Sequence, residues 1–563
     1  MKYVIYGINR VARDFLYMFP EIDVVGFTDD LRKHDTYKGK SVIKIDDIIS
    51  CKNKYDQIII CGLDKEDKAK KLNDIGLEYN TDYVYADDFF SSLDDGEEPL
   101  NSHGKNVIIW GTGYNSYYFS EHFKYFNPVF YVDTYKAGGT FFDKKIISPG
   151  EIDDWGDYYV IVAVQRDEEI VKYLNDHGLK EDVDYVNYYK IVSRSSEMLR
   201  ATIYDKHQYD LNCDTPLNHM EYLTDGKIFC CCSTFMRSIG DSSQNSITDV
   251  WRSVKHKIVC LSVQNHTYTF CEKRLCPLLF GKETKVDGGS EDKQLKEMRE
   301  FPEVSAIGFD YTCNLKCETC RSSMRVACGE EKNKMLNMAK LVEKEILPKS
   351  RFFVMAGDGE VFASEAYKHI YKSENMNDVE FIRILSNGTL FNEKNWEEFK
   401  KNKSGKVMLT ASVDAATKET YEKIRINGNF DILKKNMEFA GKLRREGELA
   451  YFRMNFVVQR RNYEEMPAFV KWGLEIGADE VFFTKMLNWG TFTKEEFRKV
   501  SMFEDDGVTP KPEMKKILND PIMKEKIVDL GTIMYNHVTI EDRNIHNYYM
   551  WELERKVPGL FTK

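Results

Sequence analysis

The sequence lacks an apolar run of the roughly 20 residues that a membrane-spanning helix requires. It also lacks a positive charge balance, because 80 Lys and Arg residues face 91 Asp and Glu residues, a formal net charge of -11. A surface of that kind does not suit non-specific nucleic-acid binding. The first residues, Met1 to Gly7, predict a strand and a glycine turn and do not have a signal-peptide layout. We therefore expect a cytoplasmic protein with no membrane or nucleic-acid partner.

Cysteine is scarce over most of the chain and concentrated in one stretch. Two of the 13 cysteines, Cys51 and Cys61, lie in the first 200 residues, and the others fall between Cys213 and Cys328. A disulfide framework is typical of a small secreted domain, whereas this clustering in a 563-residue chain of ordinary hydrophobic content, 42%, indicates metal ligation. The length exceeds what one core can organise, so we expect several domains.

Three of these cysteines form the segment Cys313-Asn-Leu-Lys-Cys317-Glu-Thr-Cys320, directly after an apolar run at 304–312. Three close thiolates suit a soft metal site, and iron–sulfur clusters are held by such runs. A 4Fe–4S cluster has four irons, so three cysteines leave one iron open. A zinc site or three ordinary buried cysteines are the alternatives at this point.

From Val304 onward, apolar strand patterns alternate with amphipathic helix patterns. The candidate strands are 304–312, 351–357, 379–386, 406–413, 449–459 and 479–486. Polar residues follow several of them, and functional sites of parallel α/β folds gather at the carboxyl ends of strands. These strand ends read Gly357-Asp358-Gly359-Glu360, Ser386-Asn387-Gly388, Ser412-Val-Asp414 with Arg425 further on, and Asn455.

The cysteine spacing and the strand ends together resemble the radical S-adenosylmethionine (SAM) superfamily, over roughly residues 205–500. The resemblance implies an α/β fold with a partial (βα)6 barrel at 300–500 and a C-terminal extension at 501–563. It implies a 4Fe–4S cluster on the three cysteines of the segment, with the amino and carboxylate groups of SAM on the open iron. The cofactor-binding residues it implies are Gly357, Asp358, Gly359, Glu360, Ser386, Asn387, Ser412, Asp414, Arg425 and Asn455.

A second cysteine set precedes the first, over residues 205–281. It contains Cys-Asp-Thr-Pro, Asp-Gly followed by three adjacent cysteines, Trp251-Arg-Ser, and a closing pair spaced C-x4-C. This order resembles the SPASM or twitch module of radical SAM enzymes, which usually follows the core rather than precedes it. The resemblance implies a second, fully ligated 4Fe–4S cluster, and a zinc-ribbon-like structural site is the alternative. The implied ligands are Cys213, Cys231, Cys271 and Cys276.

The first 200 residues contain an internal duplication. Gly7 and Gly111 each follow an apolar run, Asp29 and Asp133 each follow the next one, and both pairs are 104 positions apart. Each copy reads strand, glycine turn, helix and strand, an order that predicts a parallel sheet. The copies span 1–90 and 104–195.

Both glycine turns match the dinucleotide-binding fingerprint incompletely, and in the first copy Asn9 stands in place of the second glycine. Pyrophosphate binding needs close backbone approach at a helix N-terminus and an acidic residue about 20 positions further on. The copies resemble the Rossmann-like domains found on nucleotide-sugar acetyltransferases. The alternative is a scaffold that binds nothing or binds another protein. The candidate nucleotide-binding residues are Gly7, Asp29, Gly111, Gly113 and Asp133.

Together, the resemblances imply a radical SAM oxidoreductase or epimerase that abstracts hydrogen from a carbohydrate or a nucleotide-linked sugar. They also imply an electron donor such as flavodoxin or ferredoxin. Cys328 is a candidate hydrogen-atom donor for epimerisation, and an ordinary small apolar residue is the alternative reading. A peptide-modifying maturase and a non-catalytic iron–sulfur scaffold or redox sensor are the other candidate functions.

Overall fold

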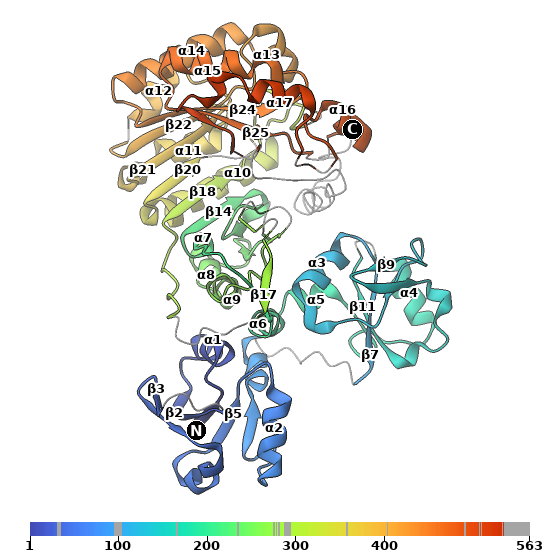
Figure 1. Ribbon diagram of the computed structural model, residues 1–563. Coiled ribbons are helices and arrows are strands. Elements are labelled where there is room, and N and C mark those ends of the chain that lie inside the picture. The colour runs from blue at the N-terminus through green and yellow to red at the C-terminus, as the bar shows by residue number, and fades with distance from the viewer. Residues whose placement is uncertain are drawn as a thin grey trace. The chain divides into compact units, whose positions relative to one another are not determined.

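The chain forms two compact units, and neither is continuous in sequence. The first consists of Met1–Asp214, Val254–Phe270 and Glu283–Met298, and the second of Thr215–Ser253, Cys271–Lys282 and Arg299–Lys563. Figure 1 shows the elements of both. The computed structural model describes residues 1–30, 35–94, 104–164, 167–233, 236–273, 276, 278–279, 282–286, 294–321, 323–355, 359–401, 403–488, 491–505, 507, 509–531 and 533.

The first copy of the duplication is a six-stranded sheet in the order β3-β4-β2-β1-β5-β6. All neighbouring strands pair in parallel except β3 and β4. This agrees with the parallel sheet that the sequence predicts. Its elements are β1 (Lys2–Tyr6), α1 (Arg10–Met18), β2 (Asp23–Thr28), β3 (Thr36–Tyr37), β4 (Lys40–Ile43), β5 (Gln57–Ile60), α2 (Lys65–Asp74) and β6 (Tyr83–Tyr85).

The second copy has the order β12-β11-β7-β8-β10-β9. Its six strands, taken in chain order, occupy the same places in the sheet as the six strands of the first copy, the arrangement that a duplication would produce. Its elements are β7 (Asn106–Trp110), α3 (Tyr114–His122), β8 (Tyr131–Val132), β9 (Thr140–Phe141), β10 (Lys144–Ile147), β11 (Tyr158–Val162), α4 (Glu168–Asp176) and β12 (Tyr185–Asn187).

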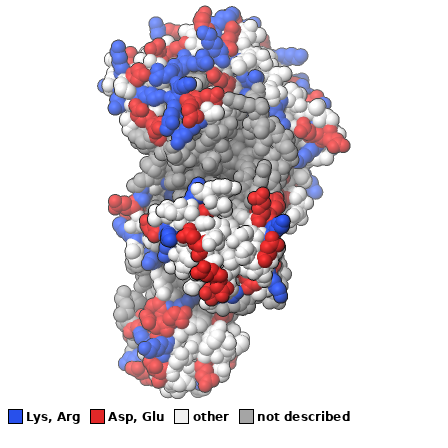
Figure 2. Space-filling view, turned by 90° about the vertical axis from the view of Figure 1, so that its right-hand side faces the viewer, with Lys and Arg blue, Asp and Glu red and all other residues white. Residues whose placement is uncertain are grey.

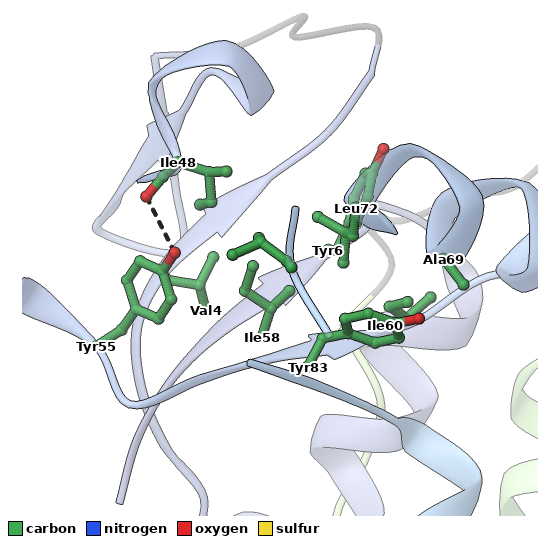
Figure 3. Packing of buried hydrophobic residues seen from close by; sticks show 10 residues of the cluster. Val4, Tyr6, Ile48, Tyr55, Ile58, Ile60, Ala69, Leu72 and Tyr83 are labelled. Carbon is green, nitrogen blue, oxygen red and sulfur yellow. Dashed lines mark hydrogen bonds between the residues drawn. The ribbon is translucent and has the colours of Figure 1, made fainter. Parts of the chain in front are cut away.

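An apolar cluster fills one face of the first copy's sheet (Figure 3). Alternate side chains of β1 and β5, among them Val4, Ile58 and Ile60, are fully buried there. The hydroxyl of Tyr55 donates to the carbonyl oxygen of Ile48 at 3.0 Å, so that the polar end of a buried ring is satisfied. Burial of this apolar surface drives the copy to fold around its sheet.

Helix α9 (Val254–Gln264) belongs to the first unit although the sequence places it within the predicted auxiliary module. It packs against α6 (Ser195–Ile203) and α1. The side-chain amide of Asn265, which follows α9, donates to the buried carboxylate of Asp14 on α1 at 2.9 Å. The first unit also contains α5 (Tyr188–Val192) and the antiparallel pair β13 (His207–Tyr209) and β17 (Thr284–Val286).

The second unit is built on one ten-stranded sheet in the order β16-β15-β14-β18-β20-β21-β22-β24-β25-β26. From β14 to β26 all neighbours pair in parallel, whereas β15 and β16 are antiparallel. The strands are β14 (His219–Leu223), β15 (Lys227–Phe229), β16 (Gly240–Asp241), β18 (Val304–Gly308), β20 (Phe352–Met355), β21 (Phe381–Ser386), β22 (Lys406–Ser412), β24 (Tyr451–Val458), β25 (Glu480–Lys485) and β26 (Val528–Asp529).

The six strands expected from the sequence are all present, but the sheet extends beyond them. Within the described residues it has two edges, β16 and β26, and does not close into a barrel. The partial barrel therefore stays a prediction. The unit's helices are α7 (Thr215–Asn218), α8 (Ile247–Trp251), α10 (Gly329–Leu341), α11 (Glu365–Lys372), α12 (Glu393–Lys400), α13 (Lys418–Ile424), α14 (Phe430–Arg445), α15 (Met466–Ile476), α16 (Lys494–Val500) and α17 (Pro512–Leu518).

The two faces of this sheet differ in burial. Helices lie along one face (Figure 1), where Phe456 and Phe483 pack against Phe469 of α15. Every second side chain of β21, β24 and β25 is buried on that side, and the side chains between them are half-buried. The half-buried set, which includes Arg383 and Arg453, defines what we call the open face.

The surface carries both signs of charge. Acidic and basic side chains are interspersed on the face shown in Figure 2, in line with the modest negative balance of the sequence. Of the helices in the described part of the chain, none has the length and apolar character that a membrane crossing requires.

Candidate active site

The loop with the three-cysteine segment follows β18 and is fixed by backbone pairing. Its short strand β19 (Lys316–Cys317) pairs antiparallel with β23 (Arg425–Ile426), and Cys317 lies opposite Arg425. The N–H of Glu318 also donates to the carbonyl oxygen of Ile424 at 3.1 Å. The cysteine loop and the segment after α13 are therefore joined, although more than 100 residues separate them in sequence.

Each of the three thiols accepts a hydrogen bond from a nitrogen donor. Arg425 Nη1 lies 3.3 Å from Cys317 Sγ, and Arg321 Nε lies 3.3 Å from Cys320 Sγ. The sulfur of Cys313 accepts from the backbone N–H of Leu315 at 3.5 Å and from Asn387 Nδ2 at 3.8 Å. Burial raises the pKa of the Cys313 thiol, and the hydrogen bond from Leu315 partly offsets this effect.

Arg425 is the charged centre of the site. Its Nη2 lies 2.6 Å from Asp414 Oδ2, and both side chains are almost fully buried. Burial disfavours the charged guanidinium, but Asp414 and Cys317 outweigh burial and raise the pKa of Arg425. Its Nε is buried and has no hydrogen-bond partner among the described residues. Asp414 is held in a left-handed conformation, with φ of 66°, and its Oδ1 accepts from the N–H of Val457 at 2.8 Å.

Glu360 ties two strand ends together from a fully buried position. The hydroxyl of Ser386 donates to its Oε1 at 2.8 Å, and the N–H of Asn387 donates to its Oε2 at 2.6 Å. Burial raises the pKa of Glu360, and these hydrogen bonds partly counter the shift. The N–H of Glu360 donates to the carbonyl oxygen of Thr312, beside the cysteine loop, at 2.7 Å.

Gly359 allows the segment after β20 to approach the residues before the cysteine loop closely. A Cβ atom at Gly359 would lie 2.3 Å from the carbonyl oxygen of Asp310 and 2.6 Å from that of Thr312. Only glycine fits where the end of β20 meets the cysteine loop. Gly357 and Asp358, which the sequence also predicts to bind cofactor, lie outside the described residues.

Asn387 connects the end of β21 to the cysteine loop. Its Nδ2 donates to Asn314 Oδ1 at 2.9 Å as well as to the Cys313 sulfur, and its Oδ1 accepts from the N–H of Thr389 at 3.0 Å. Sequence reasoning missed Asn314 and also Arg321, which donates to the carbonyl oxygen of Tyr311 at 2.8 Å. Their positions inside and directly after the cysteine segment were the available signal.

Ser412 and Asn455 lie opposite each other on β22 and β24. The carbonyl oxygen of Asn455 accepts from the N–H groups of Val413 and Asp414, and its side-chain oxygen accepts from Arg453 Nε at 2.9 Å. Both residues point to the open face, in the alternation described above. The structure thus gathers the cysteine loop, Glu360, Ser386, Asn387, Asp414 and Arg425 by direct contacts, with Ser412 and Asn455 on the adjoining strands.

The donor set of the cysteine loop fits an iron–sulfur cluster. Three thiols from one loop each accept hydrogen bonds, and the buried Arg425 places positive charge beside them, which favours the thiolate form that ligates metal. Within the described part of the chain, no three His, Cys, Asp or Glu side chains are grouped closely enough to hold a single metal ion. The ligand assignments stay predictions.

The predicted auxiliary ligands fall in different compact units: Cys213 belongs to the first, and Cys231, Cys271 and Cys276 belong to the second. Two cysteines left out of that set are buried beside other side chains. The thiol of Cys230 donates to the Met236 sulfur at 3.3 Å, and Cys260 Sγ lies 3.3 Å from His256 Nε2.

Cys328, the candidate hydrogen donor, is exposed and immediately precedes α10. The residues directly before it contact the cysteine loop: the N–H of Ala327 donates to Thr312 Oγ1 at 3.1 Å, and the N–H of Cys313 donates to the carbonyl oxygen of Arg325 at 3.0 Å. The thiol of Cys328 makes no hydrogen bond to that loop among the described residues, and its proposed role stays a prediction.

The two duplicated copies differ at their glycine turns. In the first, the side-chain oxygen of Asn9 accepts from the N–H of Ala12 and caps α1, and Asp29 accepts from the N–H of Ile8. In the second, Gly113 precedes α3 without a side-chain cap, and a Cβ atom there would meet nothing within 4 Å. The first copy thus caps its own helix N-terminus with a side chain, whereas Gly113 supplies no side-chain cap in the second.

Asp133, at the end of the second copy's next strand, is turned toward its own loop. Its Oδ2 accepts from the Thr112 hydroxyl at 2.5 Å, and its Oδ1 accepts from the N–H groups of Tyr135 and Lys136. Burial opposes ionisation, but these hydrogen bonds outweigh it and lower the pKa of Asp133. Gly7 and Gly111 have φ of 133° and 116°, conformations that favour glycine.

No family model matches the chain. The probable GTP 3′,8-cyclase of Methanococcus maripaludis strain C5 is 27% identical over 191 residues, which are 33% of this chain and 59% of the cyclase. The corresponding protein of strain C7 is 26% identical over 191 residues, with the same two coverages. These cyclases are radical SAM proteins. Over these residues the chain is similar to them. It spans 59% of the length of the curated relatives that it matches.

Solved structures of radical SAM proteins are similar at a low level. Streptococcus suis SuiB bound to precursor peptide SuiA is 14% identical, over 40% of this chain and 48% of SuiB, with a TM-score of 0.30. Native anSMEcpe with bound AdoMet is 19% identical, over 34% of this chain and 58% of that one, with a TM-score of 0.24. Radical SAM proteins bind SAM and 4Fe–4S clusters, the cofactors that the sequence predicts.

Proposed function

We propose that this chain is a radical SAM enzyme that abstracts a hydrogen atom from its substrate. The observation that carries the proposal is the contact between the cysteine loop and three other strand-end segments. Thr312 meets Glu360, Cys313 meets Asn387, and Cys317 meets Arg425. Likeness to the cyclases of Methanococcus maripaludis supports it from the sequence side.

In this proposal Cys313, Cys317 and Cys320 hold the 4Fe–4S cluster. With SAM bound, a reduced cluster there would supply one electron that cleaves SAM to methionine and a 5′-deoxyadenosyl radical, the species needed to take a hydrogen atom from a carbon–hydrogen bond of the substrate. Arg425 keeps positive charge against Cys317, and Asn387 holds the loop in place through Cys313. The orphaned Nε of Arg425 is the group best placed to meet an anionic ligand atom.

SAM is proposed to lie along the strand ends, where some of the predicted residues are accessible to it and others are buried. Ser412 and Asn455 are on the open face and are free to contact it. Glu360 is fully buried and already accepts hydrogen bonds from Ser386 and Asn387, so it shapes the strand ends and reaches SAM only through its remaining lone pairs. Gly357, Asp358 and Gly359 complete the predicted set.

The finer proposal is a carbohydrate or nucleotide-linked sugar substrate, with alcohol oxidation or epimerisation as the reaction. The uncapped helix N-terminus of the second copy supports a nucleotide-bearing group. In oxidation, Cys213, Cys231, Cys271 and Cys276 would hold an auxiliary cluster that could accept the second electron, with the alcohol proton leaving to form the carbonyl. In epimerisation, it regains a hydrogen atom from a donor, for which Cys328 is proposed.

The test is cleavage of SAM by the full chain. Anaerobically reconstituted and reduced protein should convert SAM to 5′-deoxyadenosine and methionine, measured by liquid chromatography. The variant Cys317→Ser should lose this activity, whereas the matched variant Cys51→Ser, in the first copy, should retain it. Iron-loaded wild-type protein that forms no 5′-deoxyadenosine would favour the scaffold or sensor function instead. Turnover of a peptide, and of no sugar or nucleotide, would favour the maturase.

A further inference from the structure

Two arginines lie on the open face, and one of them, Arg453, adjoins the site described above through its hydrogen bond to Asn455 Oδ1. Arg383 is on β21 and Arg453 is on β24, and between them lies Thr410 on β22. Thr410 is directly opposite Arg453 in the strand register, and Arg383 Nε donates to Thr410 Oγ1 at 3.0 Å. The buried Thr410 hydroxyl therefore positions Arg383, and Thr410 lies level with Arg453 on the neighbouring strand.

Of the two arginines, Arg453 has an acidic partner among the described residues and Arg383 has none. Arg453 lies 3.6 Å from Glu480 Oε1 and stacks over the Phe482 ring, with its Cζ 3.5 Å from the ring centroid. Glu480 is shared, because the Tyr451 hydroxyl also donates to it. Burial lowers the pKa of Arg453, Glu480 opposes that shift, and the charge of Arg383 adds to it.

Arg383 has no acidic partner among the described residues, in which its contact is with Thr410. It is also only half-buried, and its two Nη groups make no hydrogen bond among the described residues. A half-buried arginine that is positioned by a hydroxyl and lacks a counter-charge suits recognition of an external anion. Guanidinium groups bind carboxylate and phosphate oxygens through paired N–H donors.

We propose that Arg383, Thr410 and Arg453 form a subsite for an anionic group of the substrate, a phosphate or a carboxylate. The subsite shares the open face with Ser412 and Asn455 and lies two residues nearer the start of the same strands. At the rise of a β-strand this is about 7 Å from the level of the strand ends. An anion held there would anchor the substrate beside the proposed SAM site. Calling the bound anion a substrate group rests on the proposed function, whereas the anion-binding site itself does not.

Site-resolved chemical protection tests the subsite in the unaltered full chain. Phenylglyoxal, which modifies arginine, is applied with and without inorganic pyrophosphate or succinate, and the modified peptides are mapped by mass spectrometry. We expect one of the two anions to reduce modification of Arg383 and Arg453 at least fivefold and to leave Arg351 unprotected. Arg351 is the control because it is exposed and paired with Glu303 and Glu380. Protection by pyrophosphate indicates a phosphate-bearing substrate, and protection by succinate a carboxylate.

Calorimetry adds a second measurement. Binding of the protecting anion should weaken at least tenfold in Arg383→Gln and remain unchanged in Arg351→Gln. Failure of both anions to protect Arg383, or equal protection of Arg351, would overturn the subsite even if Arg383→Gln did not fold. SAM cleavage by the wild-type protein is measured in parallel. If SAM is not cleaved, the proposed function is contradicted. If the anions do not protect Arg383 from phenylglyoxal, only the subsite is contradicted.

Discussion

The buried pair of Arg425 and Asp414 gives the sharpest test of the site. Their side chains are 12% and 4% exposed, and their charged atoms lie 2.6 Å apart. Replacement of one partner leaves the other charge buried without compensation, which costs about 3–5 kcal/mol in proteins. We therefore expect Arg425→Gln and Asp414→Asn each to lower the free energy of unfolding of the second unit by about that amount.

The double variant should be less destabilised than the sum of the single variants. Once both charges are removed, no uncompensated charge remains, so a coupling energy of about 1.5–3 kcal/mol is expected. Arg444→Gln is the matched control. Arg444 binds Asp479 through two nitrogens, but the side chains are 34% and 27% exposed, so its loss should cost about 0.2–1 kcal/mol.

The assay is urea unfolding of the full chain followed by circular dichroism. Two compact units can unfold in separate steps, so the transition of the second unit must be identified. Asn265→Ala, in the first unit, marks the other transition. If Arg425→Gln cost no more than Arg444→Gln, or if the effects of Arg425→Gln and Asp414→Asn were additive, the argument from burial would be refuted.

Four further outcomes are expected. Cys317→Ser should retain about four of the eight irons that two 4Fe–4S clusters require, and an unchanged iron analysis would contradict the assignment. Burial lowers the pKa of Lys403 from its ordinary 10.5 to about 8. Between these two pH values the unfolded chain binds more protons than the folded chain, so the free energy of unfolding of the wild type should rise with pH. The urea midpoint of Lys403→Met should rise less steeply with pH than that of the wild type, and an equal slope would argue against the burial. Asn265→Ala removes a hydrogen bond to the buried Asp14 and should destabilise the first unit by about 1–3 kcal/mol, measured as a shifted first-unit urea midpoint, and no shift would refute this. Gly113→Asp should weaken uridine diphosphate binding to the full chain at least tenfold by calorimetry, and equal affinity would place any such site elsewhere.

Local patterns predicted much of the second unit's fold. Each of the six candidate strands contains an observed strand, because apolar runs between amphipathic helices are a local signal. The addition of β14 to the sheet was missed. Its partner β18 begins some 80 residues later, and a parallel pairing between distant segments leaves no trace in either sequence alone.

Helix α9 was missed as part of the first unit for a related reason. Most of its residues are buried, including Ile258, Leu261 and Val263, so it has no distinct polar face that would indicate its orientation. The sequence of a helix that is apolar on most sides indicates that other elements surround it but does not identify those elements. The buried amide at Asn265 was one polar clue, and its acceptor, Asp14, lies 251 positions away.

The site shows the same division between local and distant information. The cysteine spacing and the strand-end residues were visible in the sequence, and the contacts of Glu360, Asn387 and Arg425 bring them together. The burial of Glu360 could not be foreseen, because it depends on how two strand ends meet. The open-face arginines were also missed, since single charged residues within a strand pattern give no indication of their neighbours.

The interleaving of the two units has a consequence for synthesis. The first unit needs α9 and the segment up to Met298, so it cannot complete its core until about half of the chain has left the ribosome. Until then Asp14 lacks the amide of Asn265, and α6 and α1 lack the helix that covers them. Residues 215–253 of the second unit emerge during this interval and wait for β18 to provide a parallel neighbour for β14. The second unit needs strands as far as β26, so its sheet is completed only after the first unit's segments have all been made, although residues 215–253 are translated before the first unit is complete.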